Sequence, residues 1–368
     1  MRKTLTAAAV AALVVAGSTA CGTVENLSAG QKLDRAFDKL GKERSLSVEL
    51  DLDADAAAIR ALDAGAEPGD EMPDAIAELL TAGRISVMVE SEKPLAKSGE
   101  KDYTGIAVKL SGPDSALFEY RMVGDYLYGR VDMKALGELS GGPAPSLDDL
   151  ASGGEVPKSL KSLEPVFAGE WVKVPVKEIR DAEKLVAERA DAAGAPPAEP
   201  TLDAKTQQKL LKTLGDVVAS EADFKSAEGK DGAERITVTA SLRPLLTKLI
   251  DEVRPILKKL PQGAELPTAK ELRELPEKEG SADFTIRNGA VTEISIDLAQ
   301  LDEKLKGEKL PLVLRLGAGD KPTAPVKAAE LEFDEMLEGF MNGFMEGSMN
   351  AAPASGFSFE EAPGGAGA

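Results

Sequence analysis

Apolar and polar residues alternate along much of the chain, with the period of two that is typical of β-strands with one buried face. The clearest case is residues 46–52, where the alternation is unbroken. Turn sequences such as Gly124-Asp125 and Asn288-Gly289 join neighbouring segments and predict hairpins. The pattern predicts about eleven short strands, at 46–52, 85–89, 106–110, 117–123, 126–131, 171–174, around Phe224, and at 236–240, 284–286, 291–296 and 312–316. Strands joined in this way indicate an antiparallel sheet.

Segments with apolar residues three or four positions apart predict helices between the strands. These helices are expected at 29–41, 176–192, 202–219 and 242–260, with loops at 137–168, 261–280 and 317–327. In the longest helix, Pro255 is expected to produce a kink or a break. Several strands end on a residue suited to cap the next helix, at Asp132, Ser241 and Asp297. Hairpins followed by helices predict an α+β fold, with helices packed on the sheet.

The start of the chain has the features of an export signal. Residues 1–20 begin with Arg2 and Lys3 and continue with an uncharged run that is too short to span a bilayer. Cys21, the only cysteine, follows a pair of small residues and matches a lipobox, so we expect it to carry a lipid anchor. Ser18 stands where an aliphatic residue is usual, which leaves ordinary signal-peptidase cleavage as the alternative.

The mature chain divides into four expected segments. A tether at 21–30 precedes an α+β domain at 31–327, an amphipathic helix at 328–349 and a disordered tail at 350–368. Phenylalanine and methionine form the apolar stripe of the 328–349 helix, which is suited to cover a lipid opening or to bind a partner helix. Packing on its own domain is the alternative.

Composition excludes several classes of function. The chain has 63 acidic and 44 basic residues and a net charge of −19, so it repels phosphates, and nucleic acid is not an expected partner. It contains no histidine and one cysteine, which rules out Ser-His-Asp and Cys-His catalysis, the usual zinc sites and a redox pair. We therefore expect no metal, no cofactor and no catalysis.

Two local patterns resemble sites but have simpler explanations. Residues 98–101 match the S-x-x-K motif of Ser-Lys enzymes, yet the companion motifs of that family do not occur in the sequence, which favours chance. Asp51, Asp53 and Asp55 resemble the start of a calcium loop, but the turn glycine and the final glutamate are missing. Strand alternation explains these aspartates better. An enzyme that uses other carboxylates stays open as an alternative.

The order of elements resembles a known family. A lipobox cysteine, a short amphipathic helix and an alternating strand precede "FEYRMVGDYLYGRVD", "EWVKV" and the late hairpin "FTIRNGAVTEISIDL". In these features the chain is similar to the actinobacterial LppX/LprG lipoproteins, whose fold is akin to that of the LolA and LolB carriers. The resemblance implies a curved antiparallel half-barrel with helices on its concave face, enclosing an apolar cavity for acyl chains.

The same resemblance implies a set of ligand-binding residues on the strands. The candidates are Ile106, Val108, Leu110, Phe118, Tyr120, Met122, Ile236, Val238, Phe284, Ile286, Ile294 and Ile296. Core packing is the alternative for each of them, because core residues and pocket residues show the same alternation. Trp171, the only tryptophan, is suited either to the rim of a pocket or to the core.

The expected function is that of a membrane-anchored extracytoplasmic lipoprotein. It is expected to bind or carry a lipid, a glycolipid or another acylated molecule without catalysis, at the outer face of the cell membrane. The alternative is an envelope scaffold or partner-binding lipoprotein with a solid core and no cavity.

Overall fold

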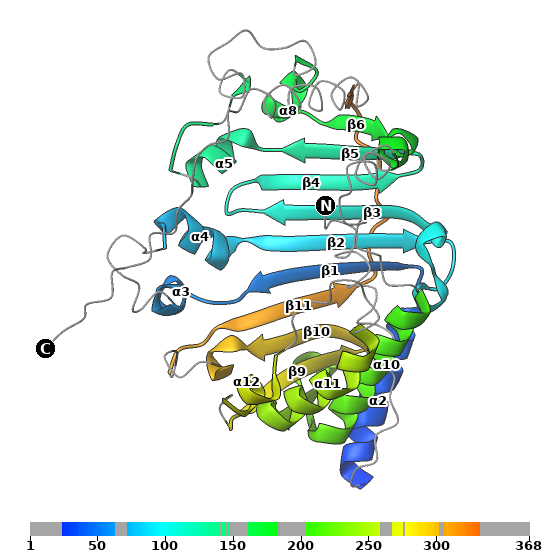
Figure 1. Ribbon diagram of the computed structural model, residues 1–368, viewed down its shortest axis with the longest axis vertical. Coiled ribbons are helices and arrows are strands. Elements are labelled where there is room, and N and C mark those ends of the chain that lie inside the picture. The colour runs from blue at the N-terminus through cyan, green and yellow to red at the C-terminus, as the bar shows by residue number, and fades with distance from the viewer. Residues whose placement is uncertain are drawn as a thin grey trace, which may run out of the picture.

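One open, curved sheet of twelve strands organises the protein (Figure 1). The computed structural model describes residues 24–62, 72–139, 141–144, 146–147, 161–182, 184, 204–257, 267–274, 277–301, 305 and 307–331. The predicted export signal and Cys21 lie outside the described residues, as do the predicted C-terminal helix from residue 332 onward and the predicted tail.

The strands form two meanders that meet in the middle of the sheet. They are β1 Ser45–Leu52, β2 Arg84–Ser91, β3 Tyr103–Ser111, β4 Ala116–Val123, β5 Tyr126–Val131, β6 Val172–Pro175, β7 Ala222–Glu228, β8 Glu234–Ser241, β9 Glu279–Arg287, β10 Ala290–Asp297, β11 Pro311–Gly317 and β12 Ala329–Glu330. Their order is β12-β6-β5-β4-β3-β2-β1-β11-β10-β9-β8-β7. Neighbours are antiparallel, except that β12 runs parallel to β6. The seam between the meanders is the β1–β11 pair.

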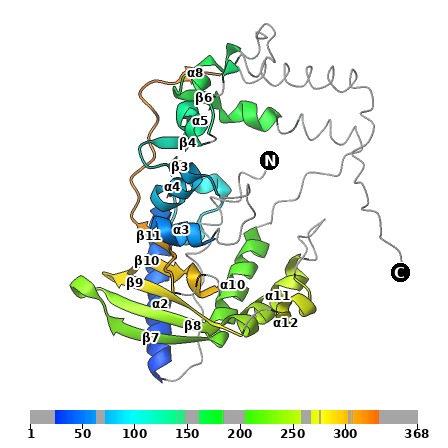
Figure 2. The same cartoon turned by 90° about the vertical axis from the view of Figure 1, so that its left-hand side faces the viewer.

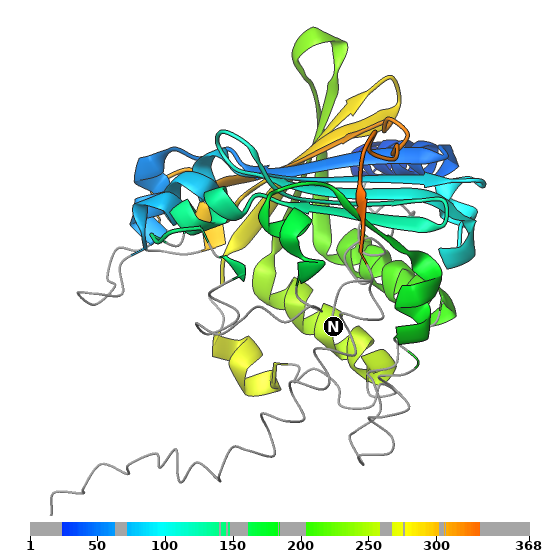
Figure 3. The same cartoon turned by 90° about the horizontal axis from the view of Figure 1, so that it is seen from above.

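Helices cover one side of this sheet. The α-helices with described bounds are α2 Val24–Lys42, α3 Ala56–Leu62, α4 Asp74–Ala82, α5 Met133–Leu139, α8 Glu164–Phe167, α10 Ala204–Glu221, α11 Leu242–Leu257 and α12 Ala269–Glu274. Short 3-10 turns are η1 Leu95–Lys97, η2 Glu100–Asp102, η3 Lys230–Gly232 and η4 Leu298–Leu301. Figure 2 shows α10, α11 and α12 on one side of the sheet, whereas the segment that follows β11 crosses the other side. Figure 3, seen from above, shows the tip of the β7–β8 hairpin pointing away from α11 and α12.

The hairpin turns and one helix cap form at the residues that the sequence predicted. Gly124, Asn288 and Gly289 have φ angles of 59°, 51° and 74°, which is the left-handed conformation that two-residue hairpin turns require. The Asp132 carboxylate accepts a hydrogen bond from the Ala135 N–H at 3.0 Å and so caps α5. Both predicted hairpins and this predicted cap are confirmed.

The main hydrophobic core lies between α2 and the sheet. The apolar stripe of α2 contributes Ala29, Leu33, Ala36 and Leu40. These side chains pack against strands from both meanders, including Leu46 of β1 and Ile236 of β8, each 0 % exposed. In the same core, the rings of Phe37 and Phe284 meet edge to face, with centroids 6.1 Å apart. Helix α2 contacts β7, β9 and β10 of one meander and the η1 turn between β2 and β3 of the other, so it ties the two meanders together.

The predicted fold class, a curved antiparallel α+β half-barrel with helices on its concave face, is confirmed. Each of the eleven predicted strands is present, and β12 is an additional strand at the beginning of the segment expected to be the C-terminal helix. Helix α2 starts at Val24, inside the segment expected to be a tether. Pro255 does not split α11, which continues to Leu257. The short helices α3, α4, α8 and α12 are additions, of which α8 and α12 lie in segments expected to be loops.

Candidate ligand-binding face

The strand register places all twelve predicted ligand-binding residues on one face of the sheet. Directly paired are Ile106 with Met122, Val108 with Tyr120, Leu110 with Phe118, Ile236 with Phe284, and Phe284 with Ile294. Residues two positions apart on a strand share a face, which adds Val238, Ile286 and Ile296. The two groups are continuous across the sheet through Ile85, Leu50 and Leu314. We call this side, on which α2 packs, the inner face and the opposite side the outer face.

Burial divides the inner face into two parts. Under α2, Ile236, Val238 and Ile286 belong to the buried core, and Ile106, Val108, Phe284 and Ile294 pack against it. Toward β4 the apolar side chains are only partly covered, and Ile85 is 41 % exposed. We call the contiguous set Ile85, Leu110, Phe118, Tyr120 and Met122 the open stretch. The structure thus brings four predicted ligand-binding residues together with Ile85, which the sequence did not single out.

Near the open stretch, several outward-facing side chains are more buried than the inward-facing ones. The outward-facing neighbours Ala107, Leu117 and Glu119 are buried, whereas the inward-facing Leu110 and Phe118 are partly exposed. Burial raises the pKa of the Tyr120 hydroxyl, so this side chain stays neutral near neutral pH. The open stretch is therefore an uncharged apolar surface that the described residues cover incompletely.

Charged side chains gather on the outer face and pair across strands. Arg315 bridges Asp51 of β1 and Glu293 of β10, and Arg84 lies 3.6 Å from Glu49. Asp51 is thus an ion-pair partner on a strand, which agrees with strand alternation rather than a calcium loop. The nearby Asp55 accepts a hydrogen bond from the Ala58 N–H at 2.8 Å and caps α3.

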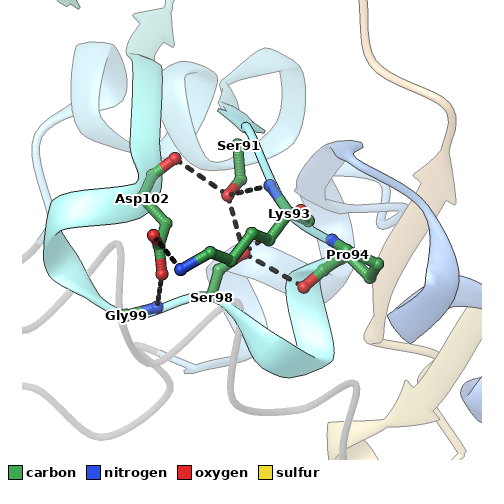
Figure 4. A network of polar contacts seen from close by, with 6 residues as sticks. All are labelled: Ser91, Lys93, Pro94, Ser98, Gly99 and Asp102. Carbon is green, nitrogen blue, oxygen red and sulfur yellow. Dashed lines mark hydrogen bonds and ion pairs between the residues drawn. The ribbon is translucent and has the colours of Figure 1, made fainter.

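Residues 98–101, which match the S-x-x-K motif, lie in the loop between β2 and β3. Ser98 belongs to a polar network in this loop (Figure 4). The Ser98 hydroxyl oxygen is 2.6 Å from that of Ser91 and donates to the Pro94 carbonyl at 3.0 Å. Lys93 pairs with Asp102 at 2.6 Å, and this hydrogen bond and the charge of Asp102 raise the pKa of Lys93. The cation of this network is Lys93, whereas the lysine of the motif is Lys101. The network instead fixes the loop that contains η1 and η2.

The described residues were also compared with the requirements of a metal site and of a membrane-spanning helix. Within them, no group of three or more acidic, histidine or cysteine side chains is arranged to hold a metal ion. None of the helices in this part of the chain is both long enough and apolar enough to cross a membrane.

Fold and face together define an α+β half-barrel with a continuous apolar inner face. No protein-family model matches the chain, and no curated protein matches it. Among solved structures, the crystal structure of the Mycobacterium tuberculosis lipoprotein LppX is similar with 10% sequence identity and a TM-score of 0.29. The match covers 80% of this chain and 95% of that chain.

Proposed function

We propose that this protein is an extracytoplasmic lipoprotein, held at the outer face of the cell membrane by a lipid on Cys21, that binds a hydrophobic ligand without transforming it. The proposed ligand is a lipid or another acylated molecule. Its proposed place is the open stretch, with Ile106 and Val108 beside it. The partial exposure of this contiguous apolar surface is the observation that carries the proposal.

The physical reason lies in the cost of exposing apolar surface. Each Å² of apolar surface left in water forgoes about 25 cal/mol of stabilisation. Contiguous exposed apolar patches on monomeric proteins therefore commonly mark binding sites. An acyl chain covers such a surface without requiring hydrogen bonds, and the open stretch offers a single polar group, the neutral Tyr120 hydroxyl.

The distribution of charge favours binding over catalysis. The carboxylates of Glu49, Asp51 and Glu119 lie on the outer face and are engaged in ion pairs. They are therefore separated by the sheet from the surface proposed to hold the ligand. A reaction on a bound acyl group would need acid or base groups on the inner face, where the open stretch carries no charge.

Native mass spectrometry of the mature protein, purified from its own membranes, tests the proposal. We expect co-purifying lipid in near-stoichiometric amount, and organic extraction then identifies it. Leu110→Gln places an amide in the open stretch and should reduce the lipid-bound fraction about tenfold, because an apolar chain cannot satisfy that amide.

The matched control is Lys109→Gln, the neighbouring residue on β3, whose exposed side chain points to the outer face. This variant should retain the bound lipid. Absence of lipid from the unmodified protein, or equal loss from both variants, would contradict the proposal and favour the scaffold alternative.

A further inference from the structure

The outer face carries a second feature near the end of the sheet that bears β6. Residues 318–328, here called the strap, lead from β11 across this face to β12 (Figure 2). Lys321 of the strap pairs with Glu90 at 3.1 Å, and Pro322 is buried against Gly105, where a Cβ atom would lie only 3.3 Å from the proline ring. A side chain at position 105 would therefore push the strap away from the sheet.

The last strap residues meet β5 and the start of β6 around a depression of about 480 Å³. It is lined by Arg130, Gly169, Glu170, Trp171, Lys327, Ala328 and Ala329. Two guanidinium groups lie over the Trp171 ring, since the central carbon of Arg121 is 4.7 Å and that of Arg130 5.2 Å from the ring centroid. These contacts fix the indole as one wall of the depression.

The depression has an excess of positive charge. Arg121 and Arg130 share one carboxylate, that of the buried Glu119. Burial acts to raise the pKa of Glu119, but hydrogen bonds from both arginines outweigh it and hold the pKa below its ordinary value. With Lys327 and Glu170 on the rim, three cationic groups face two carboxylates. One positive charge therefore remains in a chain whose net charge is −19.

Two of the cations are able to reach a ligand. Among the described residues, one terminal nitrogen of Arg130 donates a hydrogen bond to the Glu119 carboxylate. The other N–H groups of this guanidinium are then able to donate to a ligand. Lys327 is exposed at the end of the strap. A guanidinium fork binds oxyanions bidentately, and an ammonium group beside it adds a point charge.

We propose that this depression binds a singly charged oxyanion, a carboxylate or a phosphate diester, with the adjoining part of the ligand resting against the Trp171 indole. The single excess charge matches a monoanion. The same chemistry occurs in soluble acidic sugars and in the headgroups of anionic phospholipids, so the source of the anion is a matter for experiment. This site is separate from the inner face and does not depend on the ligand proposed there.

Trp171 is the only tryptophan, so its fluorescence reports on this site in the mature protein. Titration with glucuronate and with glycerophosphoglycerol should give a saturable change in emission, because an anion at Arg130 alters the guanidinium–indole contact. Neutral glucose should give none. Vesicles of phosphatidylglycerol, compared with phosphatidylcholine, show whether a membrane headgroup can be the source.

Lys327→Gln should raise the dissociation constant of the anionic probes about threefold and Arg130→Gln about tenfold. Lys225→Gln, which removes an exposed lysine from β7 at the opposite edge of the sheet, should leave it unchanged. Lys327 lies on the surface, so its variant tests the site even if Arg130→Gln fails to fold. No saturable response to any probe, an equal response to glucose, or equal effects of Lys327→Gln and Lys225→Gln would overturn the proposal.

Discussion

Two parts of the inner face are built from the same kind of strand but differ in burial. Leu46 of β1 is 0 % exposed under α2, whereas Leu110 of β3 points to the same side of the sheet and stays partly exposed. Both leucines follow the same alternation, and the difference comes from α2, which covers the first and not the second. Helix coverage, rather than strand pattern, therefore decides which apolar residues form the core.

The largest expected effect is a difference in stability between these two leucines. Leu46→Ala should lower the free energy of unfolding by about 3 kcal/mol, because it leaves a cavity in a closed core. Leu110→Ala should lower it by about 1 kcal/mol, because a partly exposed side chain has less burial to lose. Equilibrium denaturation in urea measures both values. Equal losses would show that the open stretch is part of the core.

The next effect concerns the outer face behind the open stretch, where Glu119 is buried between two arginines. Glu119→Gln should cost about 2 kcal/mol at pH 7, because it leaves charged donors without their carboxylate. The lowered pKa of Glu119 means that its contribution is complete above the ordinary value of 4.5 and is lost as the pH falls through the folded-state pKa.

Urea denaturation of both proteins between pH 7 and pH 3 tests this dependence on pH. The difference in stability between the unmodified protein and Glu119→Gln should shrink in the acidic part of that range. A difference that stays constant down to pH 3 would mean that the glutamate gains nothing from its ionised form.

The smallest expected effect is a coupling energy between two phenylalanines in the core under α2. A double-mutant cycle of Phe37→Leu and Phe284→Leu should give a coupling energy of about 1 kcal/mol, as expected for an edge-to-face aromatic pair. The same cycle of Phe37→Leu with Phe118→Leu should give about zero, because Phe118 lies in the open stretch outside the core packed by α2. Similar coupling in both cycles would indicate that α2 also reaches the open stretch.

The positions of the strands could be predicted from the sequence, but the parts of the sheet that a helix covers could not. Alternation and turn residues located the hairpins, because these signals are local. Whether Ile236 or Ile85 would be covered depended on a helix distant in the chain, which no local pattern reports. The two-residue β12 and the four-residue helix α8 are too brief for a period to be recognised.

The outer-face depression was even less accessible from the sequence. Trp171 stood out as the single tryptophan, but Arg130 and Lys327 lie far from it in the chain and meet it only through strand order and the strap. No local pattern indicated that one carboxylate, that of Glu119, would pair with both Arg121 and Arg130.

The β1–β11 seam has a consequence for biogenesis. Its partners, exemplified by Asp51 and Arg315, are 264 residues apart, so the two ends of the domain must both be available before the centre of the sheet exists. Contacts of such long range form slowly. Under the export proposed above, the chain crosses the membrane as an extended polypeptide, amino terminus first, and cannot complete its tertiary structure until almost all of it has been translocated.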